Sequence, residues 1–571
     1  MQKTFAVLSA LLPFGLAASS KLNYCSLLGP VFPPPIHLSD SPYFTAATKD
    51  LSGILQDAIY GNSSLSPIFK PNQTSFTVQI FSSKDESPLF ESYYTSQAVQ
   101  AYKAGVKNID ENTVFRIGSA SKLVTVLLLL IEKGESVFNE PIAKYVPEIR
   151  EAIAAMRSNT TQQQDAIDFL RWEQVTIGEL ASQMSGVLRD YGFLDLALSI
   201  PNPASSGLPI LPKSEIPPCG ATIACNRTEF FHGLMAGHPV VPAGSTPIYS
   251  NAAYQILAYA LETMTGQSYQ SILSKDLLHP LGLEGFSYSA PNASEGIIPD
   301  PIYWALSAGD ETPAGGLYSS VKDMSSIGRA ILNNTLLPEN IKRRWMKPDT
   351  HTSSLEFSVG APWEIYSYME DSRVIDLYTK AGDLGGYSSI LALSPDHNVG
   401  FTILAAGVGT TEAVAGLSDL VANTLLPALE DVGKTEAKTN FGGVYESSQT
   451  NSTISISTDN GPGLKVDSWV RGGDNMLTVL SAIEESSVNS VRLYPTGLNA
   501  PGEMSFRAII QDLSASQGVG PITRSCNSWE LADGKVYGNI GIDEFVFTVD
   551  SCGKGTGLSP RAWRDYLIRM H

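Results

Sequence analysis

A serine and a lysine three residues apart open one helix-like segment of this chain. Ser119 and Lys122 lie in SASKLVTVLLLLIEK, which contains no Gly or Pro and stops at Gly134. At positions i and i+3 of a helix the two side chains face the same way, and a lysine that has lost its proton can accept the proton of a serine hydroxyl. The start of a helix also stabilises an oxyanion through the helix dipole. The pattern predicts a serine nucleophile with a lysine base.

Two further short motifs follow this pair. Tyr249 and Asn251 form a Tyr-x-Asn motif just before a helix-like run, where the tyrosine can shuttle a proton and the amide can hold a substrate carbonyl or the lysine. Lys380 and Gly382 form a Lys-x-Gly motif where a predicted strand runs into a turn. There the glycine allows a close backbone approach and the lysine adds positive charge. The intervals are 130 residues from Ser119 to Tyr249 and 131 from Tyr249 to Lys380.

None of the three motifs is specific by itself. Ser-x-x-Lys recurs at Ser319 and Ser551, Tyr-x-Asn at Tyr60 and Tyr537, and Lys-Ala-Gly at Lys103. Context selects among the copies, because only the first Ser-x-x-Lys opens a long apolar helix. The order of the selected motifs along the chain adds a specificity that no single motif has.

In this order the motifs resemble the fingerprint of the serine β-lactamase and penicillin-binding protein superfamily. The segments FRIGSASK, LASQMSGVLRDYG, TPAGGLYSSVKDM and APWEIY are similar to family segments, so the likeness covers residues 45–430. The resemblance implies an α+β fold, in which an antiparallel sheet is flanked by helices and joined to an all-helical subdomain. The Tyr-x-Asn loop and KAGDLGGY are similar to the class C β-lactamase and esterase branch, where the tyrosine helps as general base.

The resemblance also implies an oxyanion hole made by the backbone N–H groups of Ser119 and Asp383, with Asn251, Lys380 and Gly382 around the substrate. The family usually has a small residue at the position of Asp383. An acidic side chain beside the pocket would disfavour a substrate carboxylate, which argues against β-lactam hydrolysis. Neither the Ser-Asp-Asn motif nor the separate glutamate of the class A branch is evident, so no catalytic glutamate is assigned.

The sequence therefore predicts a serine hydrolase that cleaves an ester or amide through a Ser119 acyl-enzyme. Lys122 and Tyr249 serve as general base, and the charge of Lys380 lowers the pKa of both. The expected partner is a small-molecule or peptide-like acyl substrate. Two alternatives stay open: an acyltransferase or transesterase acting on a natural product, favoured if an insertion at 200–226 excludes water, and a non-catalytic binding protein that retains the fold.

Other chemistries are disfavoured by composition and motif content. The formal charge of −19 argues against nucleic acid and anionic membranes as partners. No Gly-x-Ser-x-Gly elbow occurs, which disfavours a Ser-His-Asp hydrolase. There is no Cys-x-x-Cys and the histidines are scattered, so neither a metal nor another cofactor is expected. Four histidines are expected to be packed or surface residues: His232, His238, His279 and His397.

The chain is expected to divide into four parts. Residues 1–18 have the layout of a cleavable signal peptide, whose apolar run is shorter than the roughly 20 residues needed to span a bilayer. A Pro-rich arm over 19–43 precedes a β-lactamase-like domain over 44–432. Residues 437–571 alternate as in an antiparallel β domain and are similar to the lipocalin-like β domains appended to some of these enzymes.

Export has two further indicators, glycosylation sequons and cysteines. Cys219 and Cys225 are close enough to close a small loop, and Cys526 and Cys552 are expected to cross-link the C-terminal sheet, which leaves Cys25 unpaired. Seven Asn-x-Ser/Thr sequons predict surface asparagines and a secreted, extracellular glycoprotein. The sequons are at Asn62, Asn72, Asn159, Asn226, Asn292, Asn333 and Asn451.

Local patterns predict the elements that position the motifs. Residues 51–59 have the pattern of an amphipathic helix, and 75–82 followed by 87–96 that of a strand pair. Four β-rich runs within 357–407 are expected to be consecutive antiparallel strands, followed by a helix over 411–429.

Overall fold

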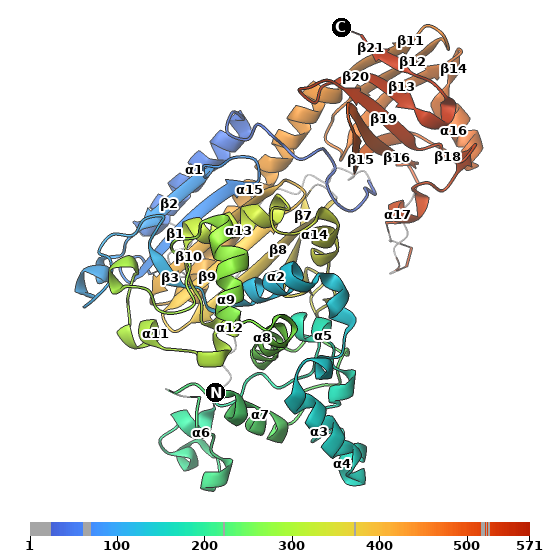
Figure 1. The fold of residues 1–571 in the computed structure, drawn as a ribbon. Helices are drawn as coiled ribbons and strands as arrows, with labels where there is room; N and C mark the ends of the chain where they lie inside the picture. The colour runs from blue at the N-terminus through green and yellow to red at the C-terminus, as the bar shows by residue number, and fades with distance from the viewer. Residues whose placement is uncertain are drawn as a thin grey trace. The chain divides into compact units, whose positions relative to one another are not determined.

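The computed structural model describes residues 24–60, 70–193, 195–220, 223–370, 373–515, 520, 522–523 and 526–570. The chain divides into two compact units, the first made of residues 33–370 and 374–436 and the second mainly of residues 437–571. Figure 1 shows the elements of both units. The predicted signal peptide and the Asn62 sequon lie outside the described residues.

An antiparallel sheet forms the centre of the first unit, with the strand order β2-β1-β10-β9-β8-β7-β6-β5. Every residue of β1 and β9 is buried, so side chains on both faces of the sheet are covered. The predicted strands of 357–407 all lie in this sheet. The strands are β1 (Thr74–Ser82), β2 (Phe90–Tyr94), β5 (Thr350–His351), β6 (Phe357–Val359), β7 (Glu364–Glu370), β8 (Arg373–Leu384), β9 (Tyr387–Ser394) and β10 (Val399–Gly407), and a separate pair is formed by β3 (Val114–Arg116) and β4 (Tyr318–Ser320).

Two helix layers cover this sheet (Figure 1). Leu55 and Val421, on the first and last helices of the unit, pack with Ile403 on one face. Leu127 and Ile327 pack with Leu391 on the other face, in a core shared with an all-helical subdomain. The helices are α1 (Pro42–Ile59), α2 (Ser121–Lys133), α3 (Pro147–Arg157), α4 (Thr160–Gln164), α5 (Ile177–Ala181), α6 (Leu196–Ser199), α7 (Arg227–Ala236), α8 (Ala252–Thr265), α9 (Tyr269–Leu273), α10 (His279–Leu281), α11 (Pro301–Ala305), α12 (Thr312–Gly315), α13 (Val321–Leu332), α14 (Glu339–Trp345) and α15 (Thr410–Phe441).

Helix α2 is the element that carries the predicted nucleophile and base. A 3-10 turn, η2 (Gly118–Ala120), leads into it, and every residue from Ser121 to Leu130 is buried. Each fully buried Leu or Val contributes roughly 1.5–3 kcal/mol, so the apolar run anchors the helix in the core. The helix ends at Gly134, which has a φ of 69°.

Helix α15 is longer than the sequence pattern predicts. It continues from Leu429 to Phe441, with Pro427 inside it. Val432 belongs to the core of the first unit, and Ala437 and Phe441 belong to the core of the second unit. Buried apolar residues therefore continue along α15 through residues 430–441, a segment whose polar composition is typical of a linker.

The second unit is a closed antiparallel barrel, which confirms the predicted β domain. Its ring follows β12-β11-β21-β20-β19-β16-β15-β13, and β13 pairs with β12 to close it. Aromatic side chains such as Phe506 and Phe547 fill the interior. The elements are β11 (Gly443–Ser447), β12 (Ser452–Ser457), β13 (Leu464–Arg471), β14 (Asp474–Asn475), α16 (Met476–Glu484), β15 (Ser490–Ala500), β16 (Glu503–Gln511), α17 (Ser528–Leu531), β17 (Val536–Tyr537), β18 (Ile540–Gly541), β19 (Glu544–Val549), β20 (Gly555–Pro560) and β21 (Leu567–Arg569).

The predicted cysteine pairing is half wrong. Cys219 and Cys225 form a disulfide, as expected, but Cys526 is bonded to Cys25 and Cys552 is free and exposed. Cys552 lies in the turn between β19 and β20, whereas Cys526 lies beside the N-terminal segment, where Ser528 Oγ donates to the Ser26 carbonyl. Chain separation alone does not reveal such a pairing across 501 residues.

The Pro-rich arm is partly buried, because Val31 and Phe32 lie in the core of the second unit. Trp469 is buried in the same core, whereas Trp529 lies on the short helix α17 and is 72% exposed.

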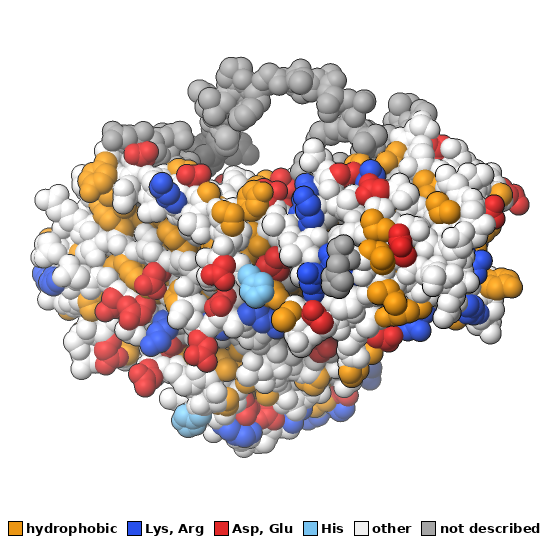
Figure 2. All heavy atoms as spheres, turned by 90° about the horizontal axis from the view of Figure 1, so that it is seen from above, with side chains coloured by type: hydrophobic (Ala, Val, Ile, Leu, Met, Phe, Trp, Pro, Cys, Tyr) orange, Lys and Arg blue, Asp and Glu red, His pale blue; other side chains and the backbone are white. Residues whose placement is uncertain are grey.

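The surface carries charge of both signs. Figure 2 shows acidic and basic side chains interspersed over the face that it draws. Among the described residues, no helix is both long and apolar enough to cross a membrane. Within the same ranges, His, Cys, Asp and Glu side chains do not gather in threes as metal ligands would.

We predict that Phe547→Ala destabilises the barrel by about 3–5 kcal/mol, because it leaves a cavity among packed aromatic rings. Phe547 is fully buried and its ring contacts those of Phe441, Tyr445 and Phe506. The measurement is urea denaturation followed by tryptophan fluorescence. Trp529→Ala removes an exposed aromatic ring and is the matched control, with an expected change within about 0.5 kcal/mol. Equal effects of the two variants would contradict this account of the core.

Peptide mapping of the unreduced protein tests the corrected cysteine pairing. We expect a linked peptide containing Cys25 and Cys526, and alkylation of Cys552 before reduction, since this thiol is exposed. A linked peptide containing Cys526 and Cys552 would instead support the pairing predicted from the sequence.

Candidate active site

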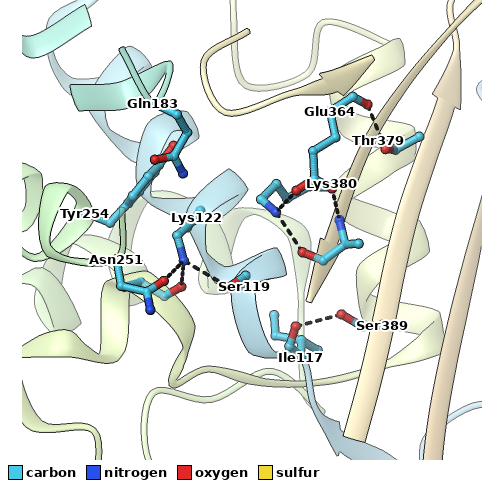
Figure 3. Close-up of polar contacts among 12 residues, drawn as sticks. Ile117, Ser119, Lys122, Gln183, Asn251, Tyr254, Glu364, Thr379, Lys380 and Ser389 are labelled. Atoms are coloured by element: carbon cyan, nitrogen blue, oxygen red, sulfur yellow. Dashed lines mark hydrogen bonds and ion pairs between the residues drawn. The ribbon is translucent and has the colours of Figure 1, made fainter. Parts of the chain in front are cut away.

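Ser119 sits in a turn that the sheet touches directly. It lies within η2, and the carbonyl of the preceding Ile117 accepts a hydrogen bond from Ser389 Oγ of β9 at 2.6 Å. Ser121 Oγ donates to the Gly118 carbonyl at 2.7 Å. These bonds fix the backbone before and after the nucleophile. Figure 3 shows Ser119 between the Asn251 loop and the strand that carries Lys380.

Lys122 is buried and touches Ser119. Its Nζ lies 2.9 Å from Ser119 Oγ, 2.7 Å from Asn251 Oδ1 and 2.6 Å from the carbonyl oxygen of Ala314. Three acceptors match the three protons of an ammonium group. The predicted pair is therefore in contact, and Asn251 contacts the lysine, one of the two roles expected for it.

A second segment holds the loop of Tyr249 and Asn251. The backbone N–H of Ser250 donates to Gln183 Oε1 and its Oγ donates to the Leu188 carbonyl, each at 2.7 Å. The Asn251 N–H donates to the Arg189 carbonyl at 2.7 Å. The Tyr249 ring lies beside Lys122, whose Nζ is 4.9 Å from the ring centroid. The loop therefore presents both predicted side chains to the Ser-Lys pair.

Lys380 also lies near the Tyr249 ring and is paired with an acid. Its Nζ is 5.5 Å from the ring centroid and 2.5 Å from Glu364 Oε1. Glu364 Oε2 also accepts the backbone N–H of Ala381 at 2.9 Å. Figure 3 shows this carboxylate, which belongs to β7, holding the lysine of β8. Lys380 is thus a cation whose charge is balanced by the neighbouring Glu364 carboxylate.

The two buried lysines have opposite pKa shifts. Burial lowers the pKa of Lys122; nearby Tyr249 opposes the shift, and the charge of Lys380 adds to it. Burial acts on Lys380 in the same direction, but Glu364 and then Tyr249 outweigh it and raise the pKa of Lys380. Lys122 is therefore the lysine that can lose its proton, while Lys380 stays a cation.

Tyr249 is influenced by both lysines. Burial alone raises the pKa of its hydroxyl, but the charges of Lys380 and Lys122 and a hydrogen bond with Ser119 lower the pKa below its usual value. A tyrosine in this setting can pass a proton to or from Ser119.

Two glycines permit the contact between the Ser119 turn and β8. A Cβ atom on Gly382 would lie 2.1 Å from the Ile117 oxygen and 2.5 Å from the Ser119 nitrogen. A Cβ atom on Gly118, whose φ is 49°, would lie 2.6 Å from the Asp383 nitrogen. These approaches bring the backbone at Ser119 close to the backbone at Asp383, the two residues whose N–H groups form the oxyanion hole that the family resemblance implies.

The side chain of Asp383 is not where the sequence argument placed it. Its Oδ1 accepts hydrogen bonds from Ser388 Oγ at 2.5 Å and from Thr411 Oγ1 of α15 at 2.7 Å. Along a strand, positions 380 and 383 face opposite sides of the sheet. The carboxylate is thus held toward α15, and its charge is a weaker argument against an anionic substrate than the ion pair of Lys380.

A cavity adjoins Ser119. Its wall is largely apolar and includes Tyr191, Phe193, Phe230 and Leu306, and its polar groups include Asn251 and Glu311. Gly220 and residues 223–225, from the insertion closed by the Cys219–Cys225 disulfide, form part of the wall. No described histidine lines this cavity; His397, for example, is buried and bonded to Ser394 and Glu430.

Several polar groups at the site were missed by sequence reasoning. Glu364 accepts a hydrogen bond from Lys380, and Asp190 accepts one from Asn251 Nδ2 at 2.9 Å. The Ala314 carbonyl accepts a hydrogen bond from Lys122. Glu364 and Asp190 lie in the family-like segments APWEIY and LASQMSGVLRDYG, respectively. This resemblance was the one sequence signal that could have pointed to them. Neither carboxylate has a spacing that marks it as a partner of a particular motif.

Comparison with protein families agrees with this geometry. Residues 77–426, more than half of the chain, match the family described as "Beta-lactamase". The chain belongs to the β-lactamase family. It is a β-lactamase-like member of a family of serine hydrolases, and its residues 433–571 match a second family, "Beta-lactamase-like-like, C-terminal domain".

Known relatives of this β-lactamase family protein include fungal proteins. A "Beta-lactamase-like protein" of Arthroderma benhamiae is 29% identical over 98% of both chains. A "Probable hydrolase M10" of Phoma sp. is 24% identical over 73% of this chain and 69% of its own length. Among solved structures, a D-stereospecific amidohydrolase from Streptomyces sp. is similar at 14% identity and a TM-score of 0.47, over 67% of this chain and 98% of that chain.

Lys380→Met tests the charge arrangement through pH dependence. With the cation removed, the pKa of both Lys122 and Tyr249 should rise, because its charge lowers both. If these groups must lose a proton to act as base, the acidic limb of kcat/KM moves to higher pH. The measurement is p-nitrophenol release from p-nitrophenyl acetate across pH. Lys342→Met, at a partly buried lysine outside the site, is the control. A limb that stays in place or moves to lower pH contradicts the arrangement.

Proposed function

We propose that this protein hydrolyses an ester or amide through a Ser119 acyl-enzyme. The observation that carries the proposal is the contact between Ser119 Oγ and the buried Lys122 Nζ at 2.9 Å, beside a tyrosine whose ring lies near both Lys122 and Lys380. A serine becomes a useful nucleophile when a neighbouring base takes its proton. Burial lowers the pKa of Lys122, which favours the neutral form that such a base requires.

The first half-reaction follows from these contacts. Ser119 Oγ attacks the substrate carbonyl, and its proton passes to Lys122 or to Tyr249. The N–H groups of Ser119 and Asp383 stabilise the oxyanion that forms. The tetrahedral intermediate collapses to an acyl-enzyme, and the leaving group takes a proton from the same pair. Water then attacks the acyl-enzyme and gives a proton to the same pair. Ser119 Oγ takes a proton back from the pair as the acid is released.

The charges at the site favour a substrate without a carboxylate at this position. The Lys380 cation is bound to Glu364, and the following residue is Ala381, which has no hydroxyl to offer. Among the described residues that line the cavity, Arg116 is the one with a cationic side chain. Its Nη1 already donates to backbone carbonyls of residues 303 and 306. We therefore propose neutral esters or amides as substrates, in preference to penicillins.

A second candidate is transfer of the acyl group to an acceptor other than water. The insertion closed by Cys219–Cys225 supplies part of the cavity wall, and a wall of this kind limits the access of water to the acyl-enzyme. An alcohol or amine acceptor on a natural product would then compete with hydrolysis.

We also propose that the protein is secreted and N-glycosylated. The six sequon asparagines within the described residues are all exposed, as a glycan requires. The two disulfides fit an oxidising compartment. Mass analysis before and after treatment with an N-glycosidase tests the glycans directly.

Intact-protein mass spectrometry tests the acyl-enzyme. After exposure to p-nitrophenyl acyl esters, the deglycosylated wild type should gain the mass of one acyl group, and Ser119→Ala should gain none, because the nucleophile is gone. A penicillin should leave less adduct than the neutral esters, because the Lys380 cation is paired with Glu364 and Arg116 donates to backbone carbonyls.

Three results would change the proposal. A stable penicillin adduct on Ser119 would favour a β-lactamase-type activity. Faster loss of the acyl group on addition of alcohols or amines than in water alone would favour the acyltransferase. A folded wild type that reacts with none of these donors would favour the non-catalytic binding protein.

A further inference from the structure

Asp190 lies two hydrogen bonds behind the Ser-Lys pair. Its Oδ2 accepts from Asn251 Nδ2 at 2.9 Å, and Asn251 Oδ1 accepts from Lys122 Nζ at 2.7 Å. Lys122 Nζ in turn lies 2.9 Å from Ser119 Oγ. A continuous chain of side-chain contacts therefore connects a partly buried carboxylate to the nucleophile.

The other contacts of Lys122 decide where its lone pair points. A neutral amine keeps two N–H donors and one lone pair. The carbonyl oxygen of Ala314, at 2.6 Å, and Asn251 Oδ1 are acceptors without protons, so they take the two donors. The lone pair then occupies the remaining tetrahedral direction, toward Ser119 Oγ. This is the orientation in which the amine can accept the proton of the serine.

That orientation depends on which end of the Asn251 amide faces Lys122. If the amide turned by 180°, its NH₂ group would donate to the lysine lone pair and compete with Ser119. The Asp190 carboxylate opposes the turn, because it accepts hydrogen bonds and would then face the amide oxygen. Resting on the proposed function, we propose that Asp190 is a positioning residue for Ser119 acylation, which holds the Asn251 amide with its oxygen on Lys122.

Glu311 allows Asp190 to remain a carboxylate. Burial, then the negative charge of Asp190 and a hydrogen bond between the two side chains, raise the pKa of Glu311 well above its usual range, which favours a proton on Glu311. Burial raises the pKa of Asp190 as well, but hydrogen bonds from Asn251 and Glu311 oppose that shift. A proton on Glu311 leaves the negative charge of the pair on Asp190, the member that contacts Asn251.

Asp190→Ala tests the positioning role. The rate of Ser119 acylation by a p-nitrophenyl ester should fall about 100-fold, the order of loss that misplacement of a reacting group causes. Asp323→Ala is the matched control. It removes another buried carboxylate, on α13, which accepts the Gly285 N–H at 2.7 Å. This control should lower the Tm and leave the acylation rate unchanged.

The double variant D190N/N251D separates positioning from packing. The double variant exchanges the acceptor and the donor of this hydrogen bond. A carboxylate at position 251 presents an oxygen to Lys122 in either orientation, and an amide at position 190 donates to that carboxylate. Acylation should recover part of the rate lost in D190A. The acidic limb should move to higher pH, because the negative charge now touches Lys122, which also faces Tyr249, Lys380 and Glu311. A packing role alone predicts neither effect.

The outcomes distinguish this inference from the proposed function. Acylation of D190A at the wild-type rate overturns the positioning role, and so does a folded double variant as slow as D190A. A wild type that no ester acylates overturns the proposed function and this inference together. Greater activity in E311Q than in E311A is expected, because Gln keeps the donor to Asp190; the opposite order overturns the assignment of the proton to Glu311.

Discussion

Two buried lysines face one tyrosine, and the site has a defined chemistry only because their charges are controlled separately. Glu364 stabilises the charged form of Lys380, whereas Lys122 has neutral acceptors around it and a cation nearby. Burial alone would lower the pKa of both lysines. One carboxylate on the neighbouring strand therefore separates a permanent cation from a potential base, and the lowered pKa of Tyr249 depends on that separation.

The scaffold serves this arrangement by bringing backbone very close to backbone. The Ser119 turn and β8 touch at two glycines, so the backbone of residue 119 lies close to that of residue 383 without intervening side chains. The long apolar helix behind Ser119 and the fully buried strand β9 beside β8 make this junction stiff. Stiffness is useful here because preorganised donors do not have to reorient during the reaction.

The three motifs could be found from the sequence because each is local and their order is informative. The sheet, the helix layers and the C-terminal barrel also followed from periodicity and family resemblance. Long-range partners could not be found this way. Glu364 and Asp190 are ordinary acidic residues until folding brings them to Lys380 and Asn251. The Cys25–Cys526 bond joins two segments that are far apart in the sequence and that no spacing rule connects. The direction of the Asp383 carboxylate depends on which face of β8 it occupies.

The insertion closed by Cys219 and Cys225 forms part of the cavity wall. The disulfide spans six positions in sequence, and Cys225 packs against the core of the first unit. The reacting groups lie on α2, on β8 and in the loop of Tyr249, and not in this insertion. In evolutionary terms, the wall and the reaction centre belong to different segments, so substitutions in the loop can reshape the cavity while the residues around Ser119 are inherited unchanged.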